Sequence, residues 1–358
     1  MPLQRRQFLA RLFFASLLPA TAFSRPDLTR TMGSTLADRG SSFYRFENFR
    51  VTSEDGERRY RVWLAIPHSP PPEQGYSSLT LLDGNAVLHH LQEDWLAPLP
   101  ENTLPVLIMV GYDTDLLFDV VARQRDYTPA LPGEGLIPDP RRPERLGGDA
   151  DAFLALLETR IKPEVQKRAR LNLAQQSLWG HSFGGLFALY ALASPSSTFT
   201  RYIPVSPATY WHNHAIDHYL KDRPSPAQVW LARGTDEVRA TPDMDDAAIA
   251  RLKQQGSDAF MTTVQTLAQH PPLQVHWKPF PGLSHGAMLP ASLPDALAIA
   301  SGKTPPGWNP TPHNLRPVKT GVCAADNQRL CLFRLNVGDS LASKLPQQDL
   351  IRSDSPRP

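Results

Sequence analysis

The feature that most constrains the fold is a series of short apolar runs, each closed by glycine or another turn residue. The runs occupy residues 78–84, 106–112, 177–182, 201–207, 229–234 and 274–282. Helix-like stretches lie between several of them, the clearest at 147–165, 183–194 and 245–269. Parallel strands need such crossover connections and are buried on both faces. The alternation therefore predicts an α/β fold with a mostly parallel central sheet and helices on both faces.

An antiparallel hairpin is predicted ahead of this sheet. Two stretches rich in β-branched and aromatic residues lie within 41–67 and flank Glu54, Asp55 and Gly56. Charged residues followed by glycine favour a tight turn, so the two stretches should pair with one another.

The 358 residues suffice for one large domain with appendages or for two medium domains. We expect a main domain over 43–302, preceded at 23–42 by a flexible leader whose polar residues lack periodicity. Residues 303–358 are rich in proline, which cannot extend helices or central strands, so this C-terminal extension should lie outside the main core. It contains Cys323 and Cys331, which we expect to form a local disulfide if the protein is exported; two reduced thiols are the alternative.

The charge balance excludes some classes of function. With 37 Lys+Arg and 35 Asp+Glu the formal charge is +2, which provides no basic field for a polyphosphate chain, so nucleic acid is not expected as a partner. No uninterrupted apolar run reaches the roughly 18 residues that span a bilayer, which excludes a polytopic membrane protein.

The first 22 residues have the layout of a cleavable export signal. A basic start is followed by a modest apolar run that ends in Ala20, Thr21 and Ala22, a small-x-small cleavage site. Arg5 and Arg6 indicate the twin-arginine variety, which would deliver the folded protein to the periplasm. An uncleaved N-terminal anchor is the alternative. Cleavage would remove three arginines and leave 34 basic against 35 acidic residues.

The strongest local signal for function is GHSFGG at 180–185, which directly follows a predicted strand and directly opens a predicted helix. In this Gly-x-Ser-x-Gly context the serine sits on a sharp turn, where glycines avoid clashes and the hydroxyl is exposed. The positive end of the following helix favours developing negative charge. The pattern predicts Ser182 as a nucleophile, and an ordinary turn serine is the alternative.

A serine nucleophile needs a general base and an acid that orients the base; in α/β hydrolases the chain order is serine, acid, histidine. His285 follows the last predicted strand, in a loop before a helix, and is the expected base. Asp236 and Glu237 both follow the strand at 229–234. Glu237 is preferred because it stands three residues beyond Gly234, and Asp236 remains the alternative.

The other histidines are weaker candidates for the base. His89 and His90 precede the serine, which is the wrong order. His214 and His218 have the i, i+4 spacing of a helical metal site, but no third ligand is evident, so surface histidines are favoured and no metal is predicted. The serine chemistry needs no organic cofactor either.

An oxyanion intermediate needs two backbone N–H donors. Phe183, directly after the nucleophile, is the expected first donor. Asn85, in the Asp-Gly-Asn sequence that closes the strand at 78–84, is the expected second donor, because Gly84 permits the bend that would turn the next amide inward. A plain turn at the end of the strand is the alternative.

Six segments carry a resemblance to a known family. They are LLDGNAVL (81–88), RQRDYTP (123–129), GGDADAFLALL (147–157), GHSFGGLFALY (180–190), PVSPATYW (204–211) and GLSHG (282–286). Together they resemble the exported siderophore esterases of the enterobactin-trilactone type, in the esterase D-like branch of the α/β hydrolases. The resemblance covers roughly residues 43–302. It implies an α/β-hydrolase fold and hydrolysis of the ester bonds of a catecholate siderophore, with iron release downstream. It assigns Ser182 and His285 as nucleophile and base, and Asn85 as oxyanion donor.

A ferric tricatecholate is a triply charged anion with aromatic rings, so its site should offer cations and flat apolar surfaces. Arg125 is the preferred cation and Arg123 the second, both from the RQRDYTP segment. Tyr127, Tyr210 and Trp211 are candidates for stacking, with core packing as the alternative for each.

Two other functions stay open at this point. The same serine chemistry could act on carbohydrate, feruloyl or acetyl esters, or transfer an acyl group. A protein with a hydrolase fold could instead bind a ferric siderophore without catalysis.

Overall fold

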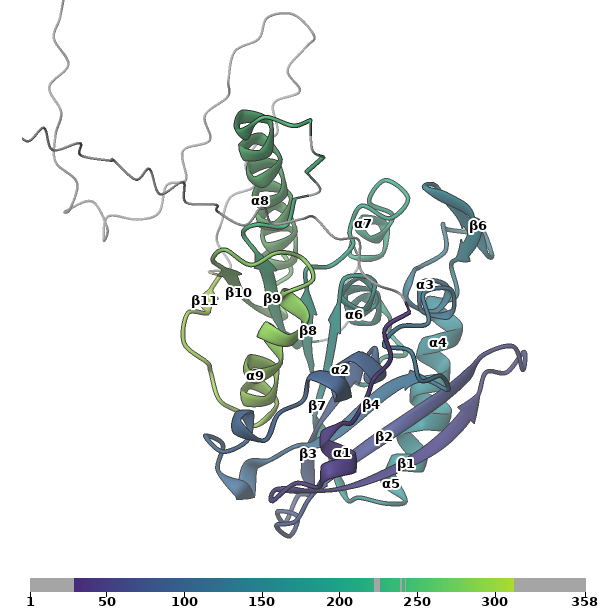
Figure 1. Ribbon diagram of the computed structural model, residues 1–358, viewed down its shortest axis with the longest axis vertical. Coiled ribbons are helices and arrows are strands. Elements are labelled where there is room, and N and C mark those ends of the chain that lie inside the picture. Colours follow the sequence, from purple (N-terminus) through teal and green to yellow (C-terminus); the bar gives the residue numbers. More distant parts are fainter. Residues whose placement is uncertain (1–28, 222–225, 239, 242, 312–358) are drawn as a thin grey trace, which may run out of the picture. The chain divides into compact units, whose positions relative to one another are not determined.

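A nine-stranded sheet runs through the part of the chain that the structure, a computed structural model, describes (Figure 1). The described residues are 29–221, 226–238, 240–241 and 243–311. The strands of this sheet are β1 Tyr44–Thr52, β2 Arg59–Pro67, β3 Tyr76–Leu82, β4 Val106–Tyr112, β7 Leu171–His181, β8 Arg201–Val205, β9 Ala227–Gly234, β10 Leu273–Phe280 and β11 Asn309–Pro310. A separate two-stranded hairpin is formed by β5 Ile137–Asp139 and β6 Arg142–Gly147.

Helices fill the connections between the strands. They are α1 Leu36–Arg39, α2 Gly84–His90, α3 Ala122–Tyr127, α4 Ala150–Leu156, α5 Lys162–Gln166, α6 Phe183–Ala193, α7 Ile216–Tyr219, α8 Asp246–Ala268 and α9 Met288–Ala300. Two short 3-10 turns, η1 Glu93–Trp95 and η2 Glu101–Thr103, follow α2, and a π-helical turn, η3 Leu157–Ile161, joins α4 to α5.

The strand order is β1-β2-β4-β3-β7-β8-β9-β10-β11. All neighbours from β4 to β10 are parallel, whereas β1, β2 and β4 pair antiparallel at one edge and β11 pairs antiparallel with β10 at the other. This arrangement confirms the predicted α/β architecture, including the N-terminal hairpin of β1 and β2.

Each face of the sheet carries its own apolar core. In β4, Val106, Ile108 and Val110 belong to one core while Leu107 and Met109 belong to the other, as strand alternation requires. The first core is covered by α4, α6 and α8, and the second by α2 and α9. All residues of β4 are buried, which explains why its sequence reads as a continuous apolar run.

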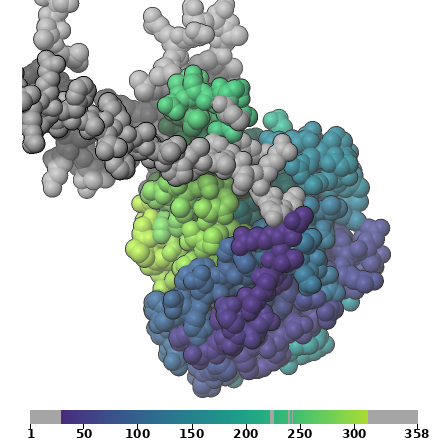
Figure 2. Space-filling model, in the orientation of Figure 1, coloured from purple at the N-terminus to yellow at the C-terminus, as the bar shows by residue number. Residues whose placement is uncertain are grey.

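The residues just before the sheet are more ordered than expected. The prediction of a flexible leader at 23–42 is wrong for its described part, because Leu36 is buried and Met32 donates its N–H to the Asp115 carbonyl. Thr35 and Asp38 form a capping box at the start of α1. Figure 2 shows this purple segment lying against the surface. A four-residue helix is too short for periodicity to reveal.

The main fold also continues beyond the expected boundary at residue 302. Trp308 is 9% exposed and belongs to the second core, and β11 extends the sheet. Pro310 is tolerated there because it lies on an edge strand. Directly after it, the Thr311 N–H donates to the Val275 carbonyl of β10 at 2.8 Å. The main unit therefore reaches at least to Thr311.

Some predictions concern residues outside those described. These are the export signal at 1–22, most of the extension at 303–358, and the pairing of Cys323 with Cys331. Among the described residues, no helix is both long and apolar enough to cross a membrane.

Candidate active site

Ser182 stands on the sharp turn between β7 and α6. Its backbone has φ 61° and ψ −116°, in the left-handed half of the map that non-glycine residues rarely occupy. A Cβ on Gly180 would lie 2.2 Å from the Gly184 carbonyl oxygen, and one on Gly185 would lie 2.8 Å from the Val205 carbonyl oxygen. Gly184 itself has room for a side chain, since its nearest neighbour would be 3.5 Å away. The close backbone approach that holds the turn therefore depends on Gly180 and Gly185.

Three side chains from separate parts of the chain form a hydrogen-bonded series at this turn. The His285 Nε2 atom lies 3.0 Å from Ser182 Oγ, and the His285 Nδ1 atom lies 3.0 Å from Glu237 Oε2. A carboxylate only accepts hydrogen bonds, so Nδ1 carries the proton and Nε2 is left to accept from the serine hydroxyl. This is the tautomer that a general base acting on Ser182 requires.

Glu237 is held by three donors. Besides His285 Nδ1, it accepts hydrogen bonds from Ser206 Oγ at 2.5 Å and from the Gly234 N–H at 2.7 Å. Burial alone would raise the Glu237 pKa, but the hydrogen bonds from His285, Ser206 and Gly234 outweigh it and hold the pKa below its usual value. The carboxylate therefore stays ionised. Sequence reasoning missed Ser206, whose only signal is its position directly after β8.

Asp236, the alternative acid, points elsewhere. Its side chain is 42% exposed and lies 3.1 Å from Lys253 Nζ on α8. The structure thus brings Glu237, and not Asp236, to the imidazole.

His181, the variable residue of the Gly-x-Ser-x-Gly pattern, was also missed. Its ring lies 4.7 Å from the His285 ring, and its Nε2 atom lies 2.8 Å from the His285 carbonyl oxygen. Burial, the nearby His285 and Arg123 lower the His181 pKa well below its usual value, so the ring is neutral. Because a carbonyl only accepts, Nε2 carries the proton and donates it to the backbone of the loop that holds His285.

The Asp-Gly-Asn turn lies beside the serine turn, because β3 and β7 are neighbours that end at the same edge of the sheet. The Asp83 carboxylate lies 3.7 Å from the position that a Cβ on Gly184 would take. Asn85 anchors this turn to the end of β4, since its Nδ2 donates to the Thr114 carbonyl at 2.8 Å and its Oδ1 accepts from the Tyr112 N–H at 2.9 Å. Its side chain is thus fully engaged, and its backbone N–H lies in the first turn of α2.

Arg123 lies close to the serine turn, but its charge is already paired. It makes a bidentate ion pair with Asp83, at 2.7 and 2.8 Å, and only 12% of its side chain is exposed. Its guanidinium also lies 5.7 Å from the centre of the Phe183 ring. Arg123 therefore joins the Asp-Gly-Asn turn to the residue that follows Ser182.

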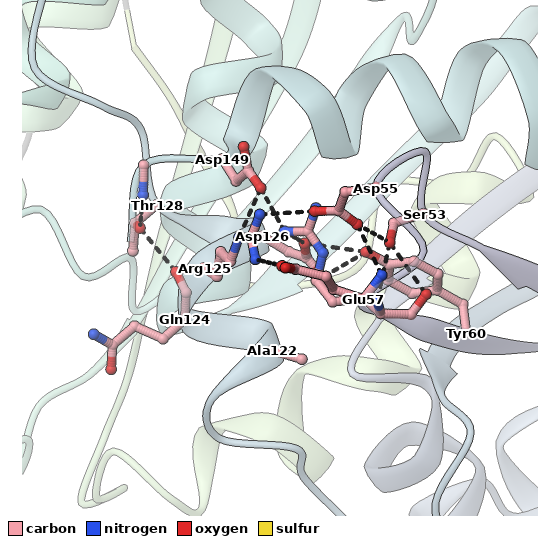
Figure 3. A network of polar contacts seen from close by, with 12 residues as sticks. Ser53, Asp55, Glu57, Tyr60, Ala122, Gln124, Arg125, Asp126, Thr128 and Asp149 are labelled. Atoms are coloured by element: carbon pink, nitrogen blue, oxygen red, sulfur yellow. Dashed lines mark hydrogen bonds and ion pairs between the residues drawn. The ribbon is translucent and has the colours of Figure 1, made fainter. Parts of the chain in front are cut away.

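Arg125, the preferred cation for the substrate, lies in a separate network (Figure 3). It contacts three carboxylates, Asp149 at 2.8 Å, Asp55 at 2.8 Å and Glu57 at 2.5 Å. These carboxylates neutralise the charge of Arg125, and the ion pairs with Asp55 and Glu57 connect α3 to the turn between β1 and β2. The structure therefore places the Arg125 side chain among these carboxylates, and its contact with the substrate stays a prediction.

Two of the predicted stacking residues belong to the core. Tyr127 is 0% exposed, and its Oη accepts the Asp83 N–H at 3.1 Å. Trp211 is 2% exposed and donates its Nε1–H to the Pro129 carbonyl at 3.0 Å. The expectation that these rings stack on a ligand is corrected by their burial. Tyr210, in contrast, is 40% exposed.

A cleft of about 500 Å³ opens beside His285 and Glu237. Tyr210 and Arg141 line it, together with residues of α8. The segment that follows β8 lies against both the cleft and the serine turn, because Tyr210 lines the cleft and the Ala208 N–H donates to the Ser182 carbonyl at 3.0 Å. The cleft therefore adjoins both side chains that follow Ser182 in the hydrogen-bonded series, His285 and Glu237.

Among the residues that the structure describes, no three His, Cys, Asp or Glu side chains form a group that could hold a metal ion. The pair His214 and His218 accordingly has no third ligand among them.

Comparison with known proteins places these residues in a family. The chain matches the family described as Putative esterase over residues 53–271. It is 37% identical to the apo-salmochelin esterase of Escherichia coli O6:H1, over 79% of this chain and 87% of that protein. It is 29% identical to the ferri-bacillibactin esterase BesA of Bacillus subtilis, over 70% of this chain and 87% of that protein.

Solved structures agree with these relatives. The enterobactin and salmochelin hydrolase IroE has a TM-score of 0.58 at 33% identity, covering 75% of this chain and 99% of that chain. The complex of IroE with DFP has a TM-score of 0.57 at 32% identity, with the same coverage. The predicted α/β-hydrolase fold is thereby confirmed. Because the family match spans more than half of the chain and includes the serine turn, the protein is a hydrolase that belongs to the putative esterase family.

Proposed function

We propose that this hydrolase cleaves the ester bonds of a catecholate siderophore of the enterobactin or salmochelin type. The relatives named above support this substrate class, since one is an apo-salmochelin esterase and another a ferri-bacillibactin esterase. The observation that carries the chemistry is the hydrogen-bonded series from Ser182 through His285 to Glu237, with both contacts of His285 at 3.0 Å.

In the proposed mechanism, His285 Nε2 takes the hydroxyl proton while Ser182 Oγ attacks the ester carbonyl. Glu237 keeps the imidazole in the required tautomer and stabilises its charged form. The His285 proton then passes to the leaving alkoxide as the ester bond breaks, which leaves an acyl-enzyme. Water, deprotonated by His285, attacks this acyl group, and the departing Ser182 oxygen regains its proton.

The oxyanion of each tetrahedral intermediate would be held by the N–H groups of Phe183 and Asn85. Both amides lie in the first turn of a helix, α6 or α2, where no helical carbonyl is available to accept them. The two helices follow neighbouring strands, and the positive ends of their dipoles favour a negative oxygen.

The test is the variant Ser182→Ala, assayed on an enterobactin-type trilactone. We expect kcat to fall by about 10³-fold or more, because the acyl-enzyme cannot form. Circular dichroism should show an unchanged fold. A fluorophosphonate probe should label the wild-type protein at Ser182 and leave the variant unlabelled. Undiminished ester hydrolysis by Ser182→Ala would refute the proposed nucleophile.

The substrate class is tested with a panel of esters. Iron-free and ferric trilactones are compared with feruloyl and acetyl esters by kcat/KM, and the trilactones should be preferred. The iron-free and ferric forms are both included because the relatives are named for one or the other. Preferred turnover of feruloyl or acetyl esters would replace the proposed substrate while leaving the serine chemistry in place.

We also propose that the protein acts in the periplasm, on the strength of the twin-arginine pattern at Arg5 and Arg6 and the small residues that end at Ala22. Replacing both arginines by lysine should retain the protein in the cytoplasm, as measured by fractionation. Export that persists in this double variant would argue against the twin-arginine route.

A further inference from the structure

One wall of the cleft carries a cation that the proposed mechanism does not use. Arg141 lies at the turn between β5 and β6 and lines the cleft together with His285. Among the described residues, no carboxylate oxygen lies within 4.0 Å of its guanidinium. Arg233, a second arginine in the cleft wall, lies 3.8 Å from the Glu237 carboxylate. Within the described part of the chain the charge of Arg141 is therefore not neutralised by a carboxylate, whereas that of Arg233 is partly neutralised.

The guanidinium of Arg141 is held in a defined position. It lies over the ring of Tyr210, 4.3 Å from its centre. A guanidinium stacked on a ring keeps its N–H groups at the edge, where they can reach a third partner. The backbone is fixed as well, since the Arg141 N–H donates to Asp139 Oδ1 at 2.8 Å.

The hairpin that carries Arg141 is itself attached beside the cleft. His212, in the segment after β8, lies with Nε2 2.9 Å from the Pro138 carbonyl oxygen of β5 and donates to it. Arg141 and Tyr210 therefore come from two elements that are joined by this contact. Such preorganisation reduces the entropy lost when a ligand binds.

We infer that Arg141, positioned by Tyr210, binds the vicinal oxygens of a dihydroxybenzoyl ring in the substrate. The two adjacent oxygens of a catechol match the planar fork of a guanidinium, as carboxylate oxygens do. This inference rests on the proposed function. It assigns recognition of the substrate's dihydroxybenzoyl ring to the β5–β6 hairpin. The arginines of the RQRDYTP segment, Arg123 and Arg125, are paired with carboxylates and are not available for this role.

The test compares Arg141→Gln, Arg141→Lys and Arg142→Gln with the wild-type protein, on iron-free and ferric enterobactin-type trilactones. Arg142 is the matched control, because it is exposed on the same hairpin and is not among the cleft-lining residues. Arg141→Gln should raise KM for both trilactones about 10-fold with little change in kcat, as expected for a lost charge-assisted hydrogen bond. Arg141→Lys should recover only part of this loss because it lacks the planar fork.

The small neutral ester p-nitrophenyl acetate serves as a second control. Arg142→Gln should hydrolyse it with the wild-type kcat/KM, and the two Arg141 variants should lose less on this ester than on the trilactones, because it offers no vicinal oxygens to Arg141. The inference is overturned if Arg141→Gln leaves the trilactone KM unchanged, or if Arg142→Gln raises it equally, since that result would indicate a general effect of charge.

Failure of the proposed function would look different. A wild-type protein that hydrolyses p-nitrophenyl acetate but no trilactone would refute the proposed substrate. In that case 2,3-dihydroxybenzamide, which has the two catechol oxygens and no carboxylate, is used as a competitive inhibitor of p-nitrophenyl acetate hydrolysis. A rise in its inhibition constant in Arg141→Gln, but not in Arg142→Gln, would support the catechol site; equal constants in all proteins would overturn it.

Discussion

At the scale of single residues, the two neighbouring acids after β9 have opposite surroundings. Glu237 is 8% exposed and contacts His285, whereas Asp236 is 42% exposed and contacts Lys253. Because their side chains leave consecutive positions of one turn in different directions, only one can orient the imidazole.

This difference predicts opposite outcomes for two matched variants. Glu237→Gln should lower kcat on the order of 10³-fold, because an amide does not stabilise the charged imidazole. Asp236→Asn should stay within about twofold of the wild-type kcat, as expected for a surface substitution. Steady-state kinetics on the same ester measures both. A loss in Asp236→Asn as large as that in Glu237→Gln would mean that the acid has been misassigned.

His181 donates its Nε2–H to the backbone carbonyl of His285, the proposed base. His181→Leu removes the donor and should lower kcat on the order of 10-fold, because small displacements of a catalytic group reduce rate steeply. His181→Asn keeps an N–H donor and should recover much of this loss, while KM changes little in either variant. Equal kcat values for the Leu and Asn variants would contradict a positioning role.

At the scale of elements, the network in Figure 3 joins the turn between β1 and β2 to α3. At its centre Asp126 is 0% exposed and accepts hydrogen bonds from Tyr60 and Tyr112, at 3.0 and 2.8 Å. Burial raises its pKa to about 7, although Arg58, at 2.9 Å, opposes the shift. The network therefore contains a carboxyl group that is protonated more readily in the folded protein than in the unfolded chain.

This raised pKa predicts how stability depends on pH. Between pH 4 and pH 7 the folded state holds the Asp126 proton more often than the unfolded chain does, so the free energy of unfolding falls as pH rises. Asp126→Asn cannot titrate. The stability of the wild-type protein relative to this variant should thus decline from pH 5 to pH 7, by at most about 1.4 kcal/mol per pH unit.

Urea unfolding at several pH values measures this difference. Asp113→Asn is a suitable control, because hydrogen bonds from Arg61 lower the Asp113 pKa and its titration therefore falls below this pH range. Its stability relative to the wild-type protein should stay constant from pH 5 to pH 7. A constant difference for Asp126→Asn as well would show that its pKa is not raised.

At the scale of the whole molecule, the folded unit extends past α9 to β11. Trp308 packs at the edge of the second core. Its Nε1–H donates to Asp295 Oδ2 at 2.9 Å, and its ring packs edge-on against Trp230, with 5.3 Å between the ring centres. The described residues beyond Gly302 thus contribute to the stability of the main unit.

Trp308→Ala should lower the free energy of unfolding by about 3 kcal/mol, because it removes a buried aromatic ring and leaves a cavity. Asn309→Ala, at the exposed next position, should change it by less than about 0.5 kcal/mol. Thermal or urea unfolding of the full chain measures both changes. An unaffected Trp308→Ala protein would place the end of the main unit before β11.

The sequence alone determined the architecture and the serine turn, because both depend on residues that are close in the chain. The alternation of apolar runs and helical stretches indicates strands that are buried on both faces of a sheet. The glycines of GHSFGG at 180–185 indicate a sharp turn in which one backbone segment lies close to another. The order of Ser182, Glu237 and His285 followed from the strand that precedes each of them.

The tertiary structure decided which side chains meet. His285 reaches Glu237 across 48 residues and Ser182 across 103 residues of sequence. Whether an arginine pairs with a carboxylate depends on what the neighbouring elements place beside it, so the sequence could not show that Arg125 contacts three carboxylates or that Arg141 lines the cleft. Composition and spacing describe a chain one segment at a time, whereas charge pairing and burial arise only once distant segments are packed together.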